Sequence, residues 1–344
     1  MSNVKVAIKI NKNQEKLAKI ENDLLSRVNK FFGANNKRAF IELLFTLGTF
    51  FILFALMIYS LGSSYWLTFI LLFPTAAMLT RAFTIQHDCG HNSFFSSLKV
   101  NNRLGSLLGI LTLTPYYYWR KTHRYHHTVA GNLDKRGIGD LDTFTINEYK
   151  SLPFYQKLWY RIYRNPAFML VVGPIAVFGL KHRLPLDNPF HSTKSWRNIM
   201  TTNLGIGVIV ASMGYFFGWE AVLFVYVPVC FLASSIGIAL FFIHHQYEDT
   251  YWAIDSEWSH FNAALQGSSY FEFLKFPSWI IGNINLHHVH HLSSRIPFYR
   301  MRECLEAIPE LRNAPKRTFK DVGNCFKLAL WDEDRKRMVS FSAA

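Results

Sequence analysis

Four long apolar segments, separated by polar ones, dominate the pattern of this 344-residue chain. Residues 40–61 contain one charged side chain, Glu42, and residues 65–80, 199–218 and 221–243 contain none. A helix of about 20 residues, at about 1.5 Å per residue, crosses a bilayer core of about 30 Å. The pattern therefore predicts an all-α integral membrane protein with four transmembrane helices in two hairpins. We expect these helices at about residues 40–60, 65–84, 199–217 and 221–243.

Shorter apolar segments indicate helices that lie at the membrane surface or, for residues 103–119, that alternatively re-enter the membrane. Residues 103–119 and 168–180 are apolar, but glycine and proline interrupt them, and both are too short to span comfortably. The basic residues 1–39 carry apolar side chains at helical spacing, as in an amphipathic surface helix or a partly disordered tail with a helical end. The remaining polar segments, including a C-terminal tail at 316–344, are predicted to form a cap on the cytoplasmic side.

The positive charge of the chain follows this topology. The formal net charge is +14, and the Lys and Arg residues number 9 before the first span, 16 in residues 81–197 and 12 after residue 243. Both hairpin tips carry none. Lys and Arg are enriched in cytoplasmic segments, so both termini and the middle segment are predicted to face the cytoplasm. The charge thus reports topology and affinity for anionic lipid headgroups, and we expect no nucleic-acid binding.

The cysteines and the N-terminus agree with a cytoplasmic arrangement. Cys89, Cys230, Cys304 and Cys325 show no paired spacing, and reduced thiols are expected on that side. No cleavable signal peptide is expected, because the first apolar run begins near residue 40 and is too long for one.

Histidines gather in three short boxes on the predicted cytoplasmic side. The boxes read HDCGH at 87–91, HRYHH at 123–127 and HHVHH at 287–291. Helical residues at i, i+3 and i+4 share a face, and neutral imidazole is the commonest metal ligand. The boxes therefore predict a metal site. The histidines that share faces are His87, His91, His123, His126, His127, His287, His290 and His291.

Eight imidazoles are more than one ion binds, so the pattern favours two metal ions. Zinc is redox-inert and needs only four ligands, whereas an imidazole-rich pair beside lipid suits iron and dioxygen. The sequence contains no His-Glu-x-x-His, and it lacks the pair of Glu-x-x-His motifs that soluble di-iron bundles carry. His288 points away from the shared face and is expected to be structural. The acidic candidates for accepting the second N–H of a ligand are Asp88, Asp140, Asp142, Glu248, Asp249 and Glu257.

Three motifs together resemble the membrane fatty acid desaturases. They are HDCGH followed by Asn92-Ser93-Phe94, Trp119-Arg120 before HRYHH, and HHVHHLSSRIP at 287–297. With GSSY at 267–270, they are most similar to the bacterial acyl-lipid omega-6 (delta-12) and omega-3 branch. The resemblance covers residues 40–315.

The resemblance implies a di-iron centre held by the box histidines and by one histidine at the end of the fourth span. His244 and His245 both stand there. Relatives often carry Gln at the first of these positions and His at the second, which favours His245. The implied ligands are His87, His91, His123, His126, His127, His245, His287, His290 and His291.

The implied reaction uses two Fe ions, dioxygen and two electrons to introduce a cis double bond into a lipid-linked acyl chain. The expected type is delta-12 (omega-6), in a bacterial inner membrane. The chain shows no fused electron-transfer domain, so a separate donor such as a ferredoxin or a small cytochrome is expected. A basic cytoplasmic face would steer an acidic carrier.

Two other functions stay open at this stage. A di-iron hydroxylase of carotenoids or alkanes uses similar boxes, although HDCGH and HHLSSRIP favour desaturation. A histidine-rich metal transporter would carry its ligands inside the spans, and no histidine falls within the four predicted spans.

Overall fold

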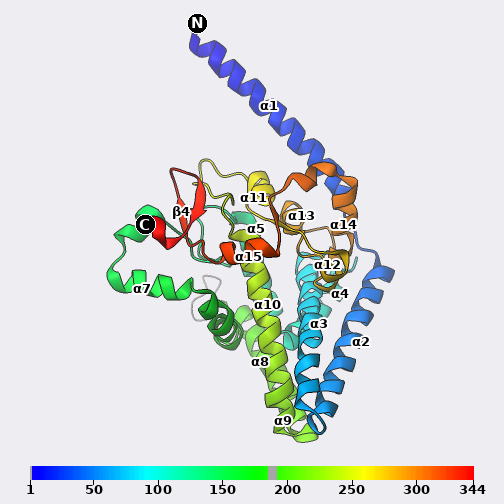
Figure 1. Ribbon diagram of the computed structural model, residues 1–344. Coiled ribbons are helices and arrows are strands. Elements are labelled where there is room, and N and C mark those ends of the chain that lie inside the picture. The colour runs from blue at the N-terminus through cyan, green and yellow to red at the C-terminus, as the bar shows by residue number, and fades with distance from the viewer. Residues whose placement is uncertain (1, 185–191) are drawn as a thin grey trace.

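The computed structural model describes residues 2–184 and 192–344, without the side chains of residues 2–14 and 17. Four of its helices are long and apolar enough to cross a membrane. They stand together below a cap of shorter elements, formed by residues 92–184 and 246–344 (Figure 1). The predicted all-α membrane architecture is confirmed. The candidate spans are α2 (Asn36–Leu61), α3 (Tyr65–His91), α8 (Thr193–Phe217) and the continuous run of α9 (Trp219–Ala221), η3 (Val222–Tyr226) and α10 (Val227–His245).

Polar side chains mark the ends of the first hairpin. The Asn35 side chain accepts a hydrogen bond from the Arg38 N–H (3.0 Å), which caps the start of α2. Ser64 caps α3 in the same way through the N–H of Leu67. At its other end, α3 stops at Asn92, whose φ of 59° is left-handed and ends a helix.

Two spans continue past the apolar runs that predicted them. Helices α3 and α10 were expected to end near residues 84 and 243, but they end at His91 and His245. The expectation that no histidine belongs to a span is therefore wrong for these helices. Their last turns are buried against the cap instead of facing lipid, so polar side chains are accommodated there. These histidines lie at the cap end of each helix and not halfway along it.

A buried ion pair joins α2 to α3 near the cap. The guanidinium of Arg81 contacts the Glu42 carboxylate, and it donates hydrogen bonds to the Thr46 hydroxyl (3.0 Å) and to the Trp279 carbonyl. Its centre also lies 4.3 Å from the Trp279 ring centroid. Trp279 belongs to α12 (Lys275–Ile280). One arginine therefore links two spans and the cap.

The shorter apolar segments fold differently from the single surface helices expected. The segment at 103–119 is divided at residues 112–115 between α4 (Leu98–Leu111) and α5 (Tyr116–Val129). The segment at 168–180 forms the π-helical turns η1 (Phe168–Val172) and η2 (Ile175–Lys181). With α7 (Phe154–Tyr163) these turns make a pair bent by 69°. Helix α7 runs across the direction of the spans (Figure 1).

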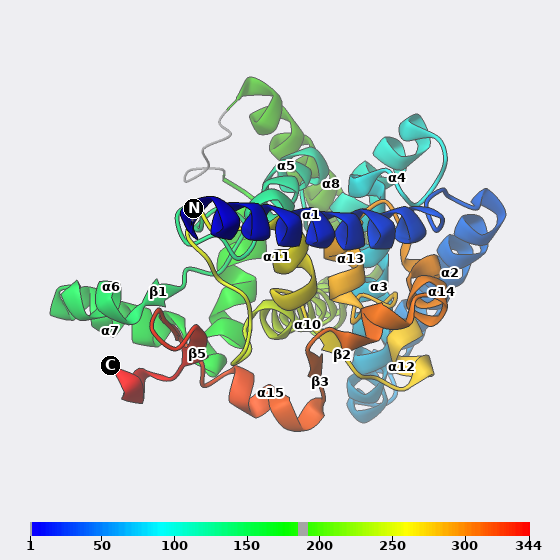
Figure 2. The same ribbon diagram turned by 90° about the horizontal axis from the view of Figure 1, so that it is seen from above.

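The remaining cap elements gather above α3 and α10 (Figures 1 and 2). Two small sheets tie the C-terminal residues to the cap: β4 pairs with β1 in parallel and with β5 antiparallel, and β2 pairs with β3 in parallel. Residues 316–344 therefore fold onto the cap. The strands are β1 (Phe144–Thr145), β2 (Tyr270–Phe271), β3 (Lys316–Arg317), β4 (Leu330–Asp332) and β5 (Arg337–Val339). The helices are α6 (Ile146–Ser151), α11 (His260–Gln266), α13 (His287–Leu292), α14 (Phe298–Ala307), η4 (Pro309–Asn313), α15 (Phe319–Cys325) and η5 (Phe341–Ala343).

The basic N-terminal segment forms the helix α1 (Ser2–Asn29). Leu24 and Val28 are buried in the hydrophobic core of the cap, and Arg27 pairs with Glu310 (2.8 Å). The first half of the helix projects beyond the cap (Figure 1). The end of α1 is thus helical and held by the cap, and the membrane-surface position of this segment stays a prediction.

The ion pair of Glu42 and Arg81 gives a stability prediction. Glu42→Gln leaves the buried guanidinium of Arg81 without its counter-charge, which should destabilise the protein by about 3 kcal/mol. We expect a clear loss of stability in a denaturant titration of the detergent-purified protein. The variant Glu220→Gln, at an exposed hairpin tip, should unfold like the wild type. Replacing both partners, as Glu42→Gln with Arg81→Met, should cost less than Glu42→Gln alone. Equal stability of Glu42→Gln and the wild type would show that the pair contributes nothing.

Candidate metal centre

Nine histidines converge where α3, α5, α10 and α13 meet beneath the cap. They form two groups, and within each group one nitrogen per ring lies within 4.8 Å of all the others. The first group is His87, His91, His123, His127 and His290, and the second is His126, His245, His287 and His291.

The Nε2 atoms of the first group face one another. Nε2 of His123 lies 2.9 Å from that of His87 and 3.1 Å from that of His127. Nε2 of His127 lies 2.9 Å from that of His290. His87 and His290 are buried, whereas the other three rings are half-buried. The first group is therefore less completely buried than the second.

The second group is buried completely. Nε2 of His287 lies 3.0 Å from that of His245, and Nε2 of His126 lies 3.3 Å from that of His291. These four side chains come from three separate parts of the chain.

The spacing of boxes two and three distributes their histidines between the groups. His123 and His127, four residues apart, join the first group, while His126 joins the second. His287 and His291 join the second group, while His290 joins the first. The expectation that all three histidines of a box face one way is therefore wrong. Positions i+3 and i+4 differ by about 100° around a helix, so one box supplies both groups.

Two glycines allow these helices to approach closely. Gly282, before α13, has φ of 66°, and an added Cβ would lie 2.7 Å from a methyl carbon of Thr84 on α3. Gly90, inside box one, lies against the Trp119 ring, which a Cβ would approach to 3.1 Å. That ring stacks on His123 with 4.6 Å between centroids. Side chains at either glycine would separate the boxes.

The arrangement of the first group fits a bound cation. A neutral imidazole has one N–H, so each Nε2 offers either one proton or one lone pair. Four Nε2 atoms in a row can therefore form hydrogen bonds at only two of their three contacts. A cation satisfies every lone pair at once. Two nitrogens that bind one ion at about 2.1 Å and at a right angle lie about 3 Å apart, close to the contacts seen here.

Contacts on the outer sides of three rings orient Nε2 inward. Nδ1 of His126 is hydrogen-bonded to Asp140, Nδ1 of His245 lies 3.0 Å from the Gly267 carbonyl oxygen, and Nδ1 of His87 lies 3.4 Å from Asp88. An acceptor at Nδ1 favours the tautomer protonated there, which leaves the Nε2 lone pair for a metal.

Asp88 and Asp140 are thus the acidic candidates that contact predicted ligands. Three others pair elsewhere: Glu248 with Arg337, Asp249 with Arg317 and Glu257 with Lys336. Asp142 uses its backbone carbonyl to accept from Tyr160 and Arg164.

Comparison with known proteins identifies the family. The family model for fatty acid desaturases matches residues 63–320. A fatty acid desaturase of Bacillus subtilis (strain 168) is 41% identical over 330 residues, which cover 96% of this chain and 93% of that protein. The chain belongs to the fatty acid desaturase family.

Two cyanobacterial relatives have more specific names. An sn-1 acyl-lipid omega-3 desaturase (ferredoxin) of Synechocystis is 30% identical, over 66% of this chain and 63% of that protein. An sn-1 oleoyl-lipid 12-desaturase of Picosynechococcus is 28% identical, over 69% of this chain and 68% of that protein. These relationships make the protein a desaturase, an oxidoreductase of lipid metabolism, and decide against the hydroxylase and transporter alternatives.

The structure of this desaturase distinguishes the two histidines that end α10. His245 belongs to the second group. His244 is also buried, but its ring stacks on His287 with 4.7 Å between centroids and its Nδ1 lies 3.3 Å from the Ser269 hydroxyl. Adjacent helical residues point in different directions, and of these two only His245 belongs to a histidine group.

Burial keeps the desaturase's cap histidines in the form that binds metals. It lowers their pKa well below the ordinary value of 6.5, and neighbouring imidazoles lower the pKa further, since two nearby positive charges repel. Neutral imidazole carries the lone pair that a metal needs. The residues concerned are His123, His127, His287, His290 and His291.

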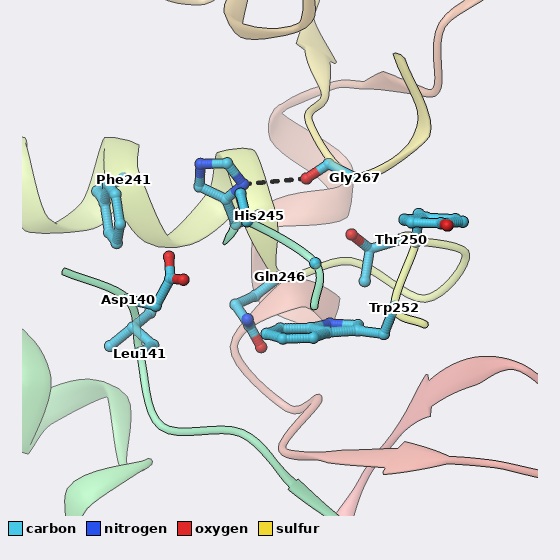
Figure 3. Close-up of a pocket in the computed structure, with 11 residues that line it drawn as sticks. Asp140, Leu141, Phe241, His245, Gln246, Thr250, Trp252 and Gly267 are labelled. Carbon is cyan, nitrogen blue, oxygen red and sulfur yellow. Dashed lines mark hydrogen bonds between the residues drawn. The ribbon is translucent and has the colours of Figure 1, made fainter. Parts of the chain in front are cut away.

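A small cavity borders the second group (Figure 3). Asp140, His245, Thr250 and Trp252 are among its lining residues, and it encloses about 10 Å³, enough for about one water. The Oδ2 atom of Asp140 is buried and has no hydrogen-bond partner within residues 2–184 and 192–344. Asp140 therefore holds His126 with one oxygen and keeps the other available beside this cavity.

Some supporting groups could not be identified from residue types. The Gly267 carbonyl that orients His245 is a backbone group, as is the Phe298 N–H that donates to Asp88 (2.7 Å). Nearly every residue has such groups, so only the fold decides which of them form hydrogen bonds that orient the histidines or their carboxylate partners.

The assignment at the end of α10 can be tested directly. His245→Ala removes a nitrogen from the second group and should abolish both desaturation and full metal content. His244→Gln should retain substantial activity and metal, because that side chain lies outside both groups. Metal analysis and an activity assay on the two purified variants measure both effects. If His244→Gln were inactive and metal-poor while His245→Ala was not, the assignment would be reversed.

Proposed function

We propose that this desaturase holds two iron ions and uses dioxygen and two electrons to introduce a cis double bond into a lipid-linked acyl chain. One iron would be bound by the first histidine group and the other by the second. The convergence of nine imidazoles into two adjacent groups carries this proposal. Zinc is redox-inert, so reduction of dioxygen requires a redox-active metal, and imidazole ligands suit iron.

The bound irons would supply the dioxygen chemistry and the hydrogen abstraction. The protein would supply the ligands, the orientation of the substrate and the exclusion of water. Burial of the second group excludes bulk water, and the Nδ1 contacts of His126 and His245 hold their rings in place. Trp119 packs against Phe83 (5.4 Å between centroids) and His123, and so forms an aromatic wall beside the first group.

A lipid-linked substrate agrees with the surface of the spans. Large apolar side chains are exposed along all four, including Leu44, Phe69, Leu204 and Phe224. Such surfaces face lipid acyl chains in a membrane protein. The acyl-lipid relatives support the same substrate class for this chain.

The electrons would come from a separate protein. Forming one double bond while reducing dioxygen to two waters requires two electrons and two protons from outside the substrate. The name of the Synechocystis relative includes ferredoxin as its donor. A ferredoxin or a small cytochrome is therefore the donor class that we propose, and the basic cap would attract an acidic carrier.

The proposed position of the new double bond is delta-12 (omega-6). The 12-desaturases among the relatives support this position. We therefore expect that expression in a host with a simple lipid profile converts oleoyl chains into 9,12-dienoic chains. Double-bond localisation by mass spectrometry tests this. A hydroxylated product would contradict desaturation, and a double bond at another position would contradict only the regiochemistry.

Metal content tests the two-iron centre. Protein purified under reducing conditions should contain close to two irons per chain, as expected for one ion in each histidine group. Elemental analysis of active protein measures this. Full activity with one iron, or with stoichiometric zinc in place of iron, would sink the proposal.

We also propose that both termini and the cap face the cytoplasm of a bacterial inner membrane. The absence of Lys and Arg from both hairpin tips supports this orientation. Reporters fused after residue 39, near residue 140 and at the C-terminus should read cytoplasmic, and a reporter at Gly62 should read external. An external signal at residue 140 would overturn the arrangement, because box two could not then lie with boxes one and three.

A further inference from the structure

An open hollow of about 520 Å³ lies where the chain enters its first span. The turn at residues 32–35 forms one wall, Arg38 of α2 forms another, and Arg300 and Glu303 of α14 complete it. It thus lies at the junction of α1, α2 and α14 (Figure 1). The nine histidines of the metal centre are not among its lining residues.

The charged groups of this hollow leave it net positive. Glu303 contacts Arg38 and lies 3.5 Å from Arg300, so one carboxylate serves two guanidinium groups. A third guanidinium, that of Arg295, lies 5.0 Å from the ring centroid of Phe32. The guanidinium fork matches phosphate oxygens and binds them through paired hydrogen bonds. The charge therefore favours a phosphate-bearing ligand.

The arginines are available to such a ligand. The side chains of Arg38, Arg300 and Glu303 are 42%, 26% and 46% exposed. Arg300 uses one terminal nitrogen for the carbonyls of Phe32 (3.1 Å) and Gly33 (3.4 Å), which fixes its direction. Arg300 is thus positioned by the turn and keeps its other terminal nitrogen for a ligand, whereas Arg38 is held mainly by the shared carboxylate.

The position of the hollow indicates a lipid. Ile41 and Phe45, one and two turns after Arg38 on the same face of α2, are 55% and 41% exposed. Side chains of this kind contact lipid tails, while arginines at the end of a span lie at headgroup level. A phospholipid whose tails lie along this face would bring its phosphate to Arg38.

We propose that this hollow binds the headgroup phosphate of an anionic phospholipid from the surrounding bilayer. Arg38 and Arg300 would bind the phosphate, and Glu303 would give up part of its contact with Arg38. The occupant would bridge α2 and α14, and so join the first span to the cap. This proposal does not depend on the identity of the metal or on the position of the double bond.

Lipid binding to the full-length protein tests the site. Native mass spectrometry in detergent would compare phosphatidylglycerol with phosphatidylcholine of the same chain length. A basic residue near a membrane surface contributes about 1 kcal/mol of attraction to anionic lipid, so Arg38→Gln and Arg300→Gln should each weaken phosphatidylglycerol binding about fivefold. Glu303→Gln should strengthen it. Arg335→Gln, at an exposed turn of the cap, is the matched control and should not change it.

One further variant and two further measurements separate the possible outcomes. Arg38→Lys keeps the charge and should bind more tightly than Arg38→Gln, and the thermal midpoint of each variant shows whether it is folded. Unchanged binding in folded Arg38→Gln and Arg300→Gln would overturn the proposal. Displacement of phosphatidylglycerol by millimolar inorganic phosphate would also overturn it, by showing an anion site that does not select lipid. Desaturation and iron are measured separately on the wild type, so failure of the proposed function is distinguishable from failure here.

Discussion

The convergence of nine imidazoles in a small buried volume is the constraint on which the rest of this structure depends. Ring nitrogens about 3 Å apart cannot all satisfy one another, because each offers only one proton or one lone pair. Burying such a cluster costs free energy when some lone pairs have no partner, and a bound cation removes that cost by accepting all of them. The fold therefore has to hold these imidazoles in fixed positions, and the elements around them can be understood as their support.

The spans and the cap share this task. Helices α3 and α10 carry box one and His245 up to the cap on rigid helices, while α5 and α13 bring boxes two and three from the cap side. Buried polar contacts link the spans to the cap. Arg81 joins α2, α3 and α12, and Asp88 receives the N–H of Phe298 at the start of α14. A membrane hairpin and a polar cap thus become one rigid support.

The two histidine groups differ in their access to solvent. The second is buried, whereas three rings of the first are half-buried. The second group is therefore better shielded from bulk water than the first. Adjacent residues of boxes two and three contribute to different groups, so the same two helices support both groups.

The sequence alone determined the architecture and the chemistry of this protein. Apolar runs long enough to span a bilayer set the four helices, since lipid requires such runs, and the three boxes supplied eight of the nine histidines that the structure brings together. Tertiary structure decided which of these histidines meet, because helical spacing sets directions but not the distances between boxes. It also decided where the spans end, since α3 and α10 continue for as long as the cap buries their polar turns. The supports of the rings, such as Asp140 and the Gly267 carbonyl, were likewise decided there, because only folding brings segments far apart in sequence into contact.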